Sequence, residues 1–220
     1  GQTSATIQAV LAEDGAFSIH SRVPGGESWT CHAGGTVRRR RVQAPNRVDL
    51  DALQKECPRE EKRSDSYARF HSLGLEYGPE FQCIENLKLG EGRAFGRVTC
   101  SDKVAESLGD YLLHPVVLDA SFQVMASMPI DGTYLPVGIK QVTLYRKPSA
   151  TCFCYARLTR RRFDRITGDI RIVDENGVCI ADVKGLNCRY VEGTRKSDTT
   201  IEQDIYEYKW FLRSREDVQQ

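Results

Sequence analysis

The sequence predicts an α+β fold in which one buried helix is wrapped by antiparallel strands. Apolar residues cover nearly every direction of a helix that begins at Pro115 and extends to about Met128, so this helix is expected inside a core. Within the last strand region the Asp174–Gly177 segment, DENG, is a strong hairpin signal. Strand-like alternating runs follow the helix at residues 133–146, 151–161 and 169–191.

Composition excludes several classes of protein. The chain has 220 residues and a net charge of +1, which gives no case for a nucleic acid or a membrane as partner. No apolar run approaches the roughly 18 residues of a spanning helix. The N-terminus has no starting Met and no secretory signal features, so we expect a piece of a longer protein. The eight cysteines lack C-x-x-C spacing and favour buried, reduced thiols in a cytoplasmic protein, with no metal site.

The first third of the chain predicts less regular structure. Residues 17–21 and 29–37 resemble strands joined by a turn-rich loop. The arginines at 38–41 indicate a solvated strand end, with phosphate binding as an open alternative. Residues 44–65 are polar and predict a linker, with one helical turn at residues 49–56.

Apolar spacing predicts a helix over residues 66–76, which Gly78 and Pro79 end. Residues 84–100 predict a two-stranded hairpin, and 103–113 a short helix or loop.

The buried helix carries an acid. Asp119 and Gln123 are four residues apart and project from the same face. An isolated buried carboxyl tends to keep its proton, and a neutral carboxylic acid is suited to protonating a leaving oxygen. Gln123 can orient the acid by a hydrogen bond. A purely structural role for Asp119, as a cap or as a partner of a buried strand residue, stays open at this point.

Four motifs carry a resemblance to a known family. The segment LHPVVLDASFQ (113–123) resembles the H-P-x-x-L-D-A-x-x-Q signature of dehydratase domains in type I polyketide synthases and animal-type fatty acid synthases. Residues 74–82 (GLEYGPEFQ) are similar to G-Y-x-Y-G-P-x-F, and residues 134–144 (YLPVGIKQVTL) are similar to the segment with L-P-x-x-W. Residues 177–191 resemble the final strand pair.

The resemblance implies a double hot dog, in which each half is a long helix wrapped by a curved antiparallel sheet. Residues 66–193 would form the complete second hot dog, which carries the acid. Residues 1–43 would be the closing strands of the first, residues 44–65 a linker, and residues 194–220 a linker after the dehydratase. A homodimer is an open alternative to a monomer.

The resemblance also implies a reaction: loss of water from a 3-hydroxyacyl thioester held on an acyl carrier protein. Asp119 would be the catalytic acid and Gln123 its orienting partner. The tunnel for the acyl chain and the phosphopantetheine arm would be lined by Tyr77, Gly78, Pro79, Phe81, Leu135 and Pro136. No cofactor or metal of the domain itself is expected, and the partners would be the carrier protein and neighbouring synthase domains.

The chain departs from the family pattern in three places. The family's general base is a histidine in H-x-x-x-G-x-x-x-x-P, and none of the four histidines here has Gly four residues later. Leu75 replaces a Tyr, and Ile139 stands where many modular synthases have Trp. We therefore expect the parent protein to dehydrate but this piece alone to be inactive. A non-catalytic scaffold and a cyclising double hot dog (product-template or pyran-forming) remain alternatives.

Overall fold

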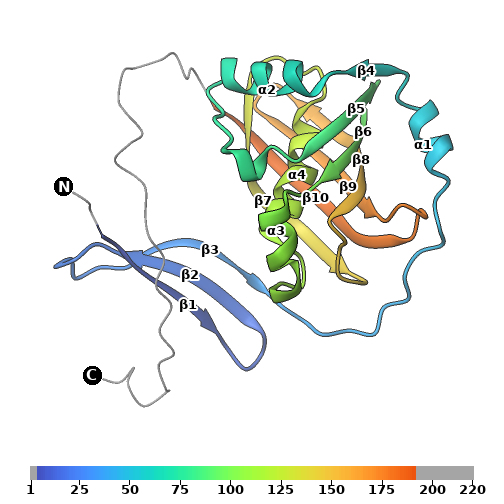
Figure 1. The fold of residues 1–220 in the computed structure, drawn as a ribbon. Helices are drawn as coiled ribbons and strands as arrows, with labels where there is room; N and C mark the ends of the chain where they lie inside the picture. Colours follow the sequence, from blue (N-terminus) through green and yellow to red (C-terminus); the bar gives the residue numbers. More distant parts are fainter. Residues whose placement is uncertain (1–3, 192–220) are drawn as a thin grey trace. The chain divides into compact units, whose positions relative to one another are not determined.

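The computed structural model of the chain describes residues 4–191, which divide into two compact units, residues 4–41 and 42–191 (Figure 1). The first unit is an antiparallel sheet in the order β1-β2-β3, with β1 at Thr6–Leu11, β2 at Ala16–Arg22 and β3 at Thr30–Thr36. The sequence predicted strands near β2 and β3 but missed β1. In β1 only Gln8 is half-buried and the other residues are exposed, so β1 lacks the alternation of a strand with one covered face.

The second unit contains most of the secondary structure. Seven of its strands form one sheet, and every neighbouring pair in that sheet is antiparallel. In chain order the elements are α1 (Leu50–Lys55), β4 (Arg59–Glu61), α2 (Arg63–Ser72), η1 (Pro79–Phe81), β5 (Ile84–Gly90), β6 (Arg93–Thr99), α3 (Asp102–Ser107), η2 (Leu108–Asp110), α4 (Pro115–Ala126), β7 (Thr133–Leu144), β8 (Thr151–Arg162), β9 (Arg165–Val173) and β10 (Cys179–Val191).

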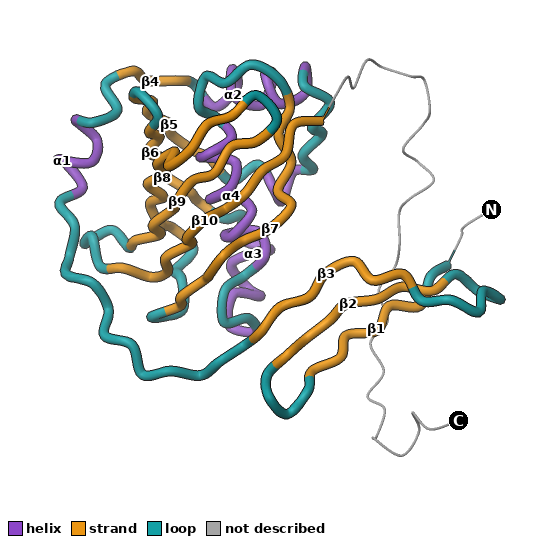
Figure 2. The backbone as a smooth tube through the Cα atoms, turned by 180° about the vertical axis from the view of Figure 1, so that it is seen from behind, coloured by secondary structure: helices purple, strands orange, loops and turns teal. Residues whose placement is uncertain are grey.

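The sheet curves around α4. Its order is β4-β5-β6-β8-β9-β10-β7, so β7 follows α4 in sequence but lies at the far edge, beside β10. Helix α4 packs against β5, β6, β8 and β9, and from behind it lies in the hollow of the sheet (Figure 2). A long helix wrapped by an antiparallel sheet is the hot-dog arrangement, so the predicted fold class is confirmed for this unit.

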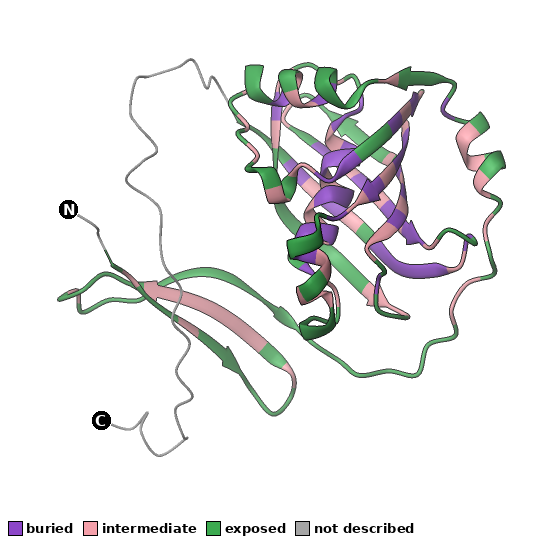
Figure 3. Ribbon diagram, viewed as in Figure 1, coloured by how far each residue is buried: buried purple, intermediate pink, exposed green. Residues whose placement is uncertain are grey.

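The buried residues of α4 and of the strands around it form the core, which is the buried zone in Figure 3. Strand β8 buries Cys152, Cys154 and Ala156, which alternate with more exposed residues, so the alternating strand predicted over residues 151–161 has one face in the core. Helix α4 approaches the sheet closely where β6 has Gly96. A Cβ atom on that glycine would lie 2.5 Å from Val124 Cγ2, so a side chain there would displace the helix.

One predicted turn joins two neighbouring strands of the sheet. The predicted turn between β9 and β10 forms at Asp174–Gly177, with Gly177 at a φ of 74°. Asp174 Oδ1 accepts hydrogen bonds from the amides of Asn176 and Val178 at 2.9 Å each, which closes the turn.

Part of the segment expected to be a linker, residues 44–65, belongs to the folded unit. Asp49 caps α1 through the amides of Asp51 and Ala52, which confirms a helical turn here. The short strand β4 pairs with β5, and α2 already begins at Arg63. Local polarity hid β4, because an edge strand has little to bury. Within residues 4–191 no helix is long and apolar enough to cross a membrane, and the predicted tail linker lies outside the described residues.

Candidate active site

Helix α4 is fixed at its N-terminus by His114. Pro115 occupies the first helical position, and His114 Nδ1 accepts the amide hydrogen of Val116 at 3.2 Å. The other ring nitrogen, Nε2, must therefore carry the proton, which it donates to Ser107 Oγ at 3.2 Å. Burial lowers the pKa of His114, consistent with a neutral ring. The imidazole is therefore a capping group of α4.

Asp119 and Gln123 contact each other on one face of α4. Gln123 Nε2 donates to Asp119 Oδ2 at 2.7 Å and to the carbonyl oxygen of Phe81 at 2.9 Å. Its Oε1 accepts from the hydroxyl of Tyr67 at 3.0 Å. Gln123 is only 1% exposed, so all its polar atoms are satisfied within the protein.

Asp119 opens onto an apolar cavity of about 70 Å³. It is the only carboxylic acid among the described residues that line this space. The others are Phe70, Leu73, Leu75, Tyr77, Phe122, Met125, Ala126, Ile130, Gly132, Thr133, Tyr134, Leu135, Pro136, Ile166 and Cys188. Such a mostly apolar lining, with one carboxyl group in its wall, suits an aliphatic chain.

The structure brings together most of the predicted site residues, in two different ways. Tyr77, Leu135 and Pro136 line the cavity with Asp119. Phe81 contributes its backbone carbonyl, which holds Gln123. Gly78 and Pro79 do not line the cavity; they cap and begin the short helix η1, whose turn presents that carbonyl.

Sequence reasoning missed the cavity residues from β9 and β10, Ile166 and Cys188, because only tertiary pairing brings these strands beside α4. It also missed Tyr67. A tyrosine in an amphipathic helix has no local pattern that marks a polar contact with a glutamine 56 positions away.

Burial dominates the electrostatics of the site. Desolvation raises the pKa of Asp119, and the hydrogen bond from Gln123 offsets part of this rise. Burial also raises the pKa of Tyr67 to about 12 and that of Tyr77 further, so both phenols are neutral donors at physiological pH. The cavity therefore favours the protonated, proton-donating form of Asp119 more than water does.

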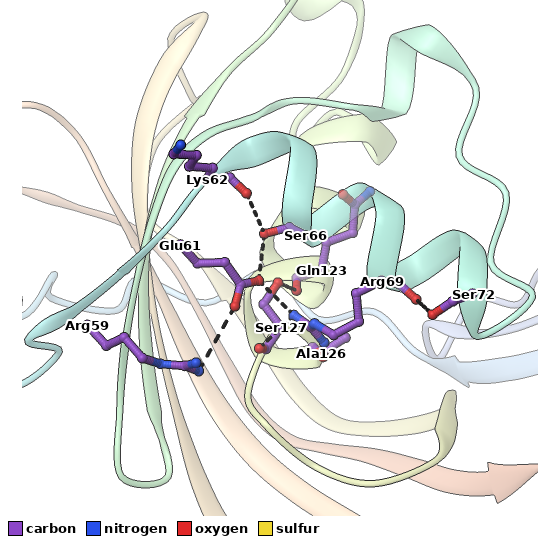
Figure 4. A network of polar contacts seen from close by, with 9 residues as sticks. All are labelled: Arg59, Glu61, Lys62, Ser66, Arg69, Ser72, Gln123, Ala126 and Ser127. Atoms are coloured by element: carbon purple, nitrogen blue, oxygen red, sulfur yellow. Dashed lines mark hydrogen bonds and ion pairs between the residues drawn. The ribbon is translucent and has the colours of Figure 1, made fainter.

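A second polar network holds the C-terminal end of α4 (Figure 4). We define the polar clamp as Glu61, Ser66, Arg69 and Ser127. Arg69 Nη2 lies 2.9 Å from Glu61 Oε1 and donates to the carbonyl of Ser127 at 2.8 Å, and Ser66 Oγ donates to Glu61 at 2.8 Å. Ser127 Oγ donates to the carbonyl of Gln123 at 2.9 Å, so the clamp reaches the residue that orients Asp119.

No histidine is among the described residues that line the cavity. His71 lies on α2 and pairs with Glu76 at 3.7 Å, and His114 is the cap of α4. His20 and His32 lie in the three-stranded sheet, where they contact Ser18 and Ser21. In residues 4–191 no cluster of three or more His, Cys, Asp and Glu side chains could hold a metal ion.

Comparison with known proteins adds the family. The model of the polyketide synthase dehydratase N-terminal domain matches residues 45–198, which is more than half of the chain. Polyketide synthase PksN of Bacillus subtilis is 26% identical over 218 residues, 93% of this chain and 4% of that protein. One of the phenolphthiocerol/phthiocerol polyketide synthases of Mycobacterium tuberculosis is 30% identical over 227 aligned positions, 96% of this chain and 12% of that protein.

Solved structures agree with these relatives. A trans-AT polyketide synthase dehydratase domain from Brevibacillus brevis superposes with a TM-score of 0.76 at 28% identity, covering 84% of this chain and 69% of that one. Two variants of the CurK dehydratase superpose at 0.71, with 28% identity, 85% of this chain and 67% of theirs. One has a histidine replaced by phenylalanine and the other an aspartate replaced by asparagine, and both are described as inactive mutants. The chain spans only 4 to 12% of the length of the first curated relatives. Because the family model matches more than half of the chain, the chain belongs to the polyketide synthase dehydratases.

Proposed function

We propose that the chain supplies the acid half of a dehydratase site, which removes water from a 3-hydroxyacyl thioester to give an enoyl thioester. One observation carries the proposal. Asp119, the single carboxyl group among the described residues that line the cavity, faces a mostly apolar space and is held there by Gln123, whose amide donates to Oδ2. A desolvated acid with one fixed oxygen is suited to general acid catalysis.

The geometry assigns the two carboxyl oxygens of Asp119 different tasks. Oδ2 accepts from Gln123 Nε2, so a proton on the acid belongs on Oδ1, which no hydrogen bond reaches within the described residues. In the proposed step a base removes a proton from C2, the C2–C3 double bond forms and the C3–O bond breaks. The leaving hydroxyl takes the Oδ1 proton and departs as water. The base then holds the C2 proton, and Asp119 is left ionised until a proton returns.

The base is proposed to come from outside these 220 residues. A histidine is the expected group by family resemblance, and none lines the cavity among the described residues. The inactive histidine and aspartate variants of the CurK dehydratase support a reaction that needs both residue types. Under this proposal the chain holds the acid, the orienting amide and part of the acyl tunnel. It turns over substrate only together with the segment that supplies the base.

The partners are proposed on the same basis. The relatives are polyketide synthases many times longer than this chain, so other synthase domains are expected to flank it. The thioester is proposed to arrive on the phosphopantetheine arm of an acyl carrier protein. Leu135 and Pro136 on β7, with Tyr77, would guide that arm and the acyl chain into the cavity.

The test compares the 220-residue chain with the same chain extended by the natural preceding region. Both are incubated with a 3-hydroxyacyl carrier protein, and enoyl product is measured by mass spectrometry. Product is expected from the extended protein and not from the chain alone. In the extended protein, Asp119→Asn is expected to abolish turnover, whereas Asp110→Asn, on the exposed turn η2, serves as the matched control. Unchanged turnover of Asp119→Asn would contradict the assigned role, and an inactive extended protein would favour a scaffold.

A further inference from the structure

The hydrogen bonds behind Asp119 form a chain with a fixed direction. It begins at the backbone amide of Ile84, which can only donate and lies 3.1 Å from the hydroxyl oxygen of Tyr67. The hydroxyl has accepted this bond, and its own proton goes to Gln123 Oε1 at 3.0 Å. The two amide hydrogens of Gln123 then go to the carbonyl of Phe81 and to Asp119 Oδ2.

We propose that Tyr67 is a positioning residue of this site, which fixes the amide orientation of Gln123 and thereby determines which oxygen of Asp119 is free to carry the reacting proton. The role in turnover rests on the proposed function. The effect on Asp119 itself does not, because it concerns only the ground state of this chain.

Tyr67 is rigid enough for the task. Its ring packs edge-on against Phe70, with centroids 5.9 Å apart, and against Tyr77, with centroids 6.2 Å apart. Phe70 is fully buried, and the guanidinium of Arg63 lies 5.8 Å from the centre of the Tyr67 ring. Helix α2, the start of β5 and helix α4 therefore meet at one hydroxyl group. An immobilised donor loses little further entropy when it orients its acceptor.

A rotated Gln123 amide would have opposite effects on its neighbours. If Oε1 faced Asp119, it would oppose an ionised carboxylate and would accept a proton from a neutral one. It would also face the carbonyl of Phe81, an acceptor against an acceptor. The Tyr67 hydroxyl disfavours this arrangement, because its proton needs an acceptor and the NH₂ group of a rotated amide cannot accept a hydrogen bond.

Charged groups do not mask the effect within the cavity. The titratable groups that line the cavity beside Asp119 are the phenols of Tyr77 and Tyr134 and the thiol of Cys188. Burial raises the pKa of Tyr77 and raises that of Cys188 to about 11, so both are neutral in the pH range where a carboxyl ionises. Tyr67 itself faces Asp119 from α2 and stays neutral in the same range. Burial and the Gln123 hydrogen bond are what shift the pKa of Asp119. A change in the pKa of Asp119 on losing one hydroxyl would therefore report the Gln123 hydrogen bond.

The experiment measures the ionisation of Asp119 by carbon-13 NMR of the side-chain carboxyl in the 220-residue chain. Tyr67→Phe removes only the hydroxyl. We expect the pKa of Asp119 to rise by about 0.5 to 1 unit, since a net hydrogen bond to the carboxylate is weakened. The matched control is Tyr155→Phe, which removes a hydroxyl that donates to Glu56 and is expected to leave Asp119 unchanged. An equal pKa in Tyr67→Phe and wild type would overturn the proposal.

A second measurement covers the case in which Tyr67→Phe does not fold. Replacing Tyr67 by 3-fluorotyrosine keeps the hydroxyl and makes it a stronger donor, so the pKa of Asp119 is expected to fall. An unchanged or higher pKa of Asp119 would count against the positioning role of Tyr67. In the extended protein, Tyr67→Phe is expected to lower kcat about 3- to 10-fold and to shift its pH profile with the pKa, leaving KM nearly unchanged. If Asp119→Asn loses turnover but Tyr67→Phe leaves the pKa of Asp119 unchanged, the proposed function stands and only the positioning role of Tyr67 is refuted.

Discussion

Replacing Arg69 by methionine should destabilise the hot-dog unit through the polar clamp. Methionine keeps most of the packing but removes the charge-assisted hydrogen bonds to Glu61 and to the carbonyl of Ser127, at 2.9 and 2.8 Å. Glu61 is 14% exposed in its side chain and would keep only Ser66 as a close donor. Hydrogen bonds to charged groups contribute about 1.5 to 3 kcal/mol, and a cation at a helix C-terminus about 0.3 to 1 kcal/mol. Arg69 is 31% exposed, which lowers both contributions, so we expect a loss of about 2 to 3 kcal/mol.

Urea denaturation followed by circular dichroism measures this loss. Arg59→Met is the matched control, because Arg59 faces the same carboxylate at 4.0 Å with 58% of its side chain exposed and should contribute about 0 to 1 kcal/mol. A double-mutant cycle with Glu61→Gln isolates the Arg69–Glu61 pair. The reasoning is refuted if Arg69→Met and Arg59→Met cost the same, or if the coupling energy is near zero.

Three further predictions follow from single residues. Burial lowers the pKa of His114, so the unfolded chain binds a proton on this ring more readily than the folded chain. The stability that the neutral ring contributes is therefore full above about pH 6.5 and is lost as the pH falls below it. In His114→Asn the free energy of unfolding should depend less on pH between about pH 7 and 5 than in the wild type. Burial raises the pKa of Asp119, so its contribution is present below about pH 3.9 and lost as the pH rises through the folded-state value; Asp119→Asn should therefore melt higher than wild type at pH 7 and not at pH 3.5. Gly96→Ala should lose about 1 to 3 kcal/mol in urea denaturation by pressing on Val124, and Val124→Ala in the same chain should recover part of that loss; additive losses would contradict the close approach.

The sequence by itself determined the elements whose signals are local. Three features depend on spacing along one segment and appear as predicted: the helix beginning at Pro115, the turn at Asp174–Gly177 and the alternating strand over residues 151–161. The i, i+4 relation of Asp119 and Gln123 also fixed their common face on the helix, and the structure adds the 2.7 Å hydrogen bond between them.

Only the tertiary structure decided what surrounds that pair. Tyr67 and Cys188 reach the site from a separate helix and a strand, and their positions depend on long-range packing that no local period encodes. The strand β4 was hidden for a related reason, since an exposed edge strand is specified by its partner's backbone and not by its own side chains. The acid was readable because burial leaves a pattern in sequence, whereas the hydroxyl that orients it is identified only by distance.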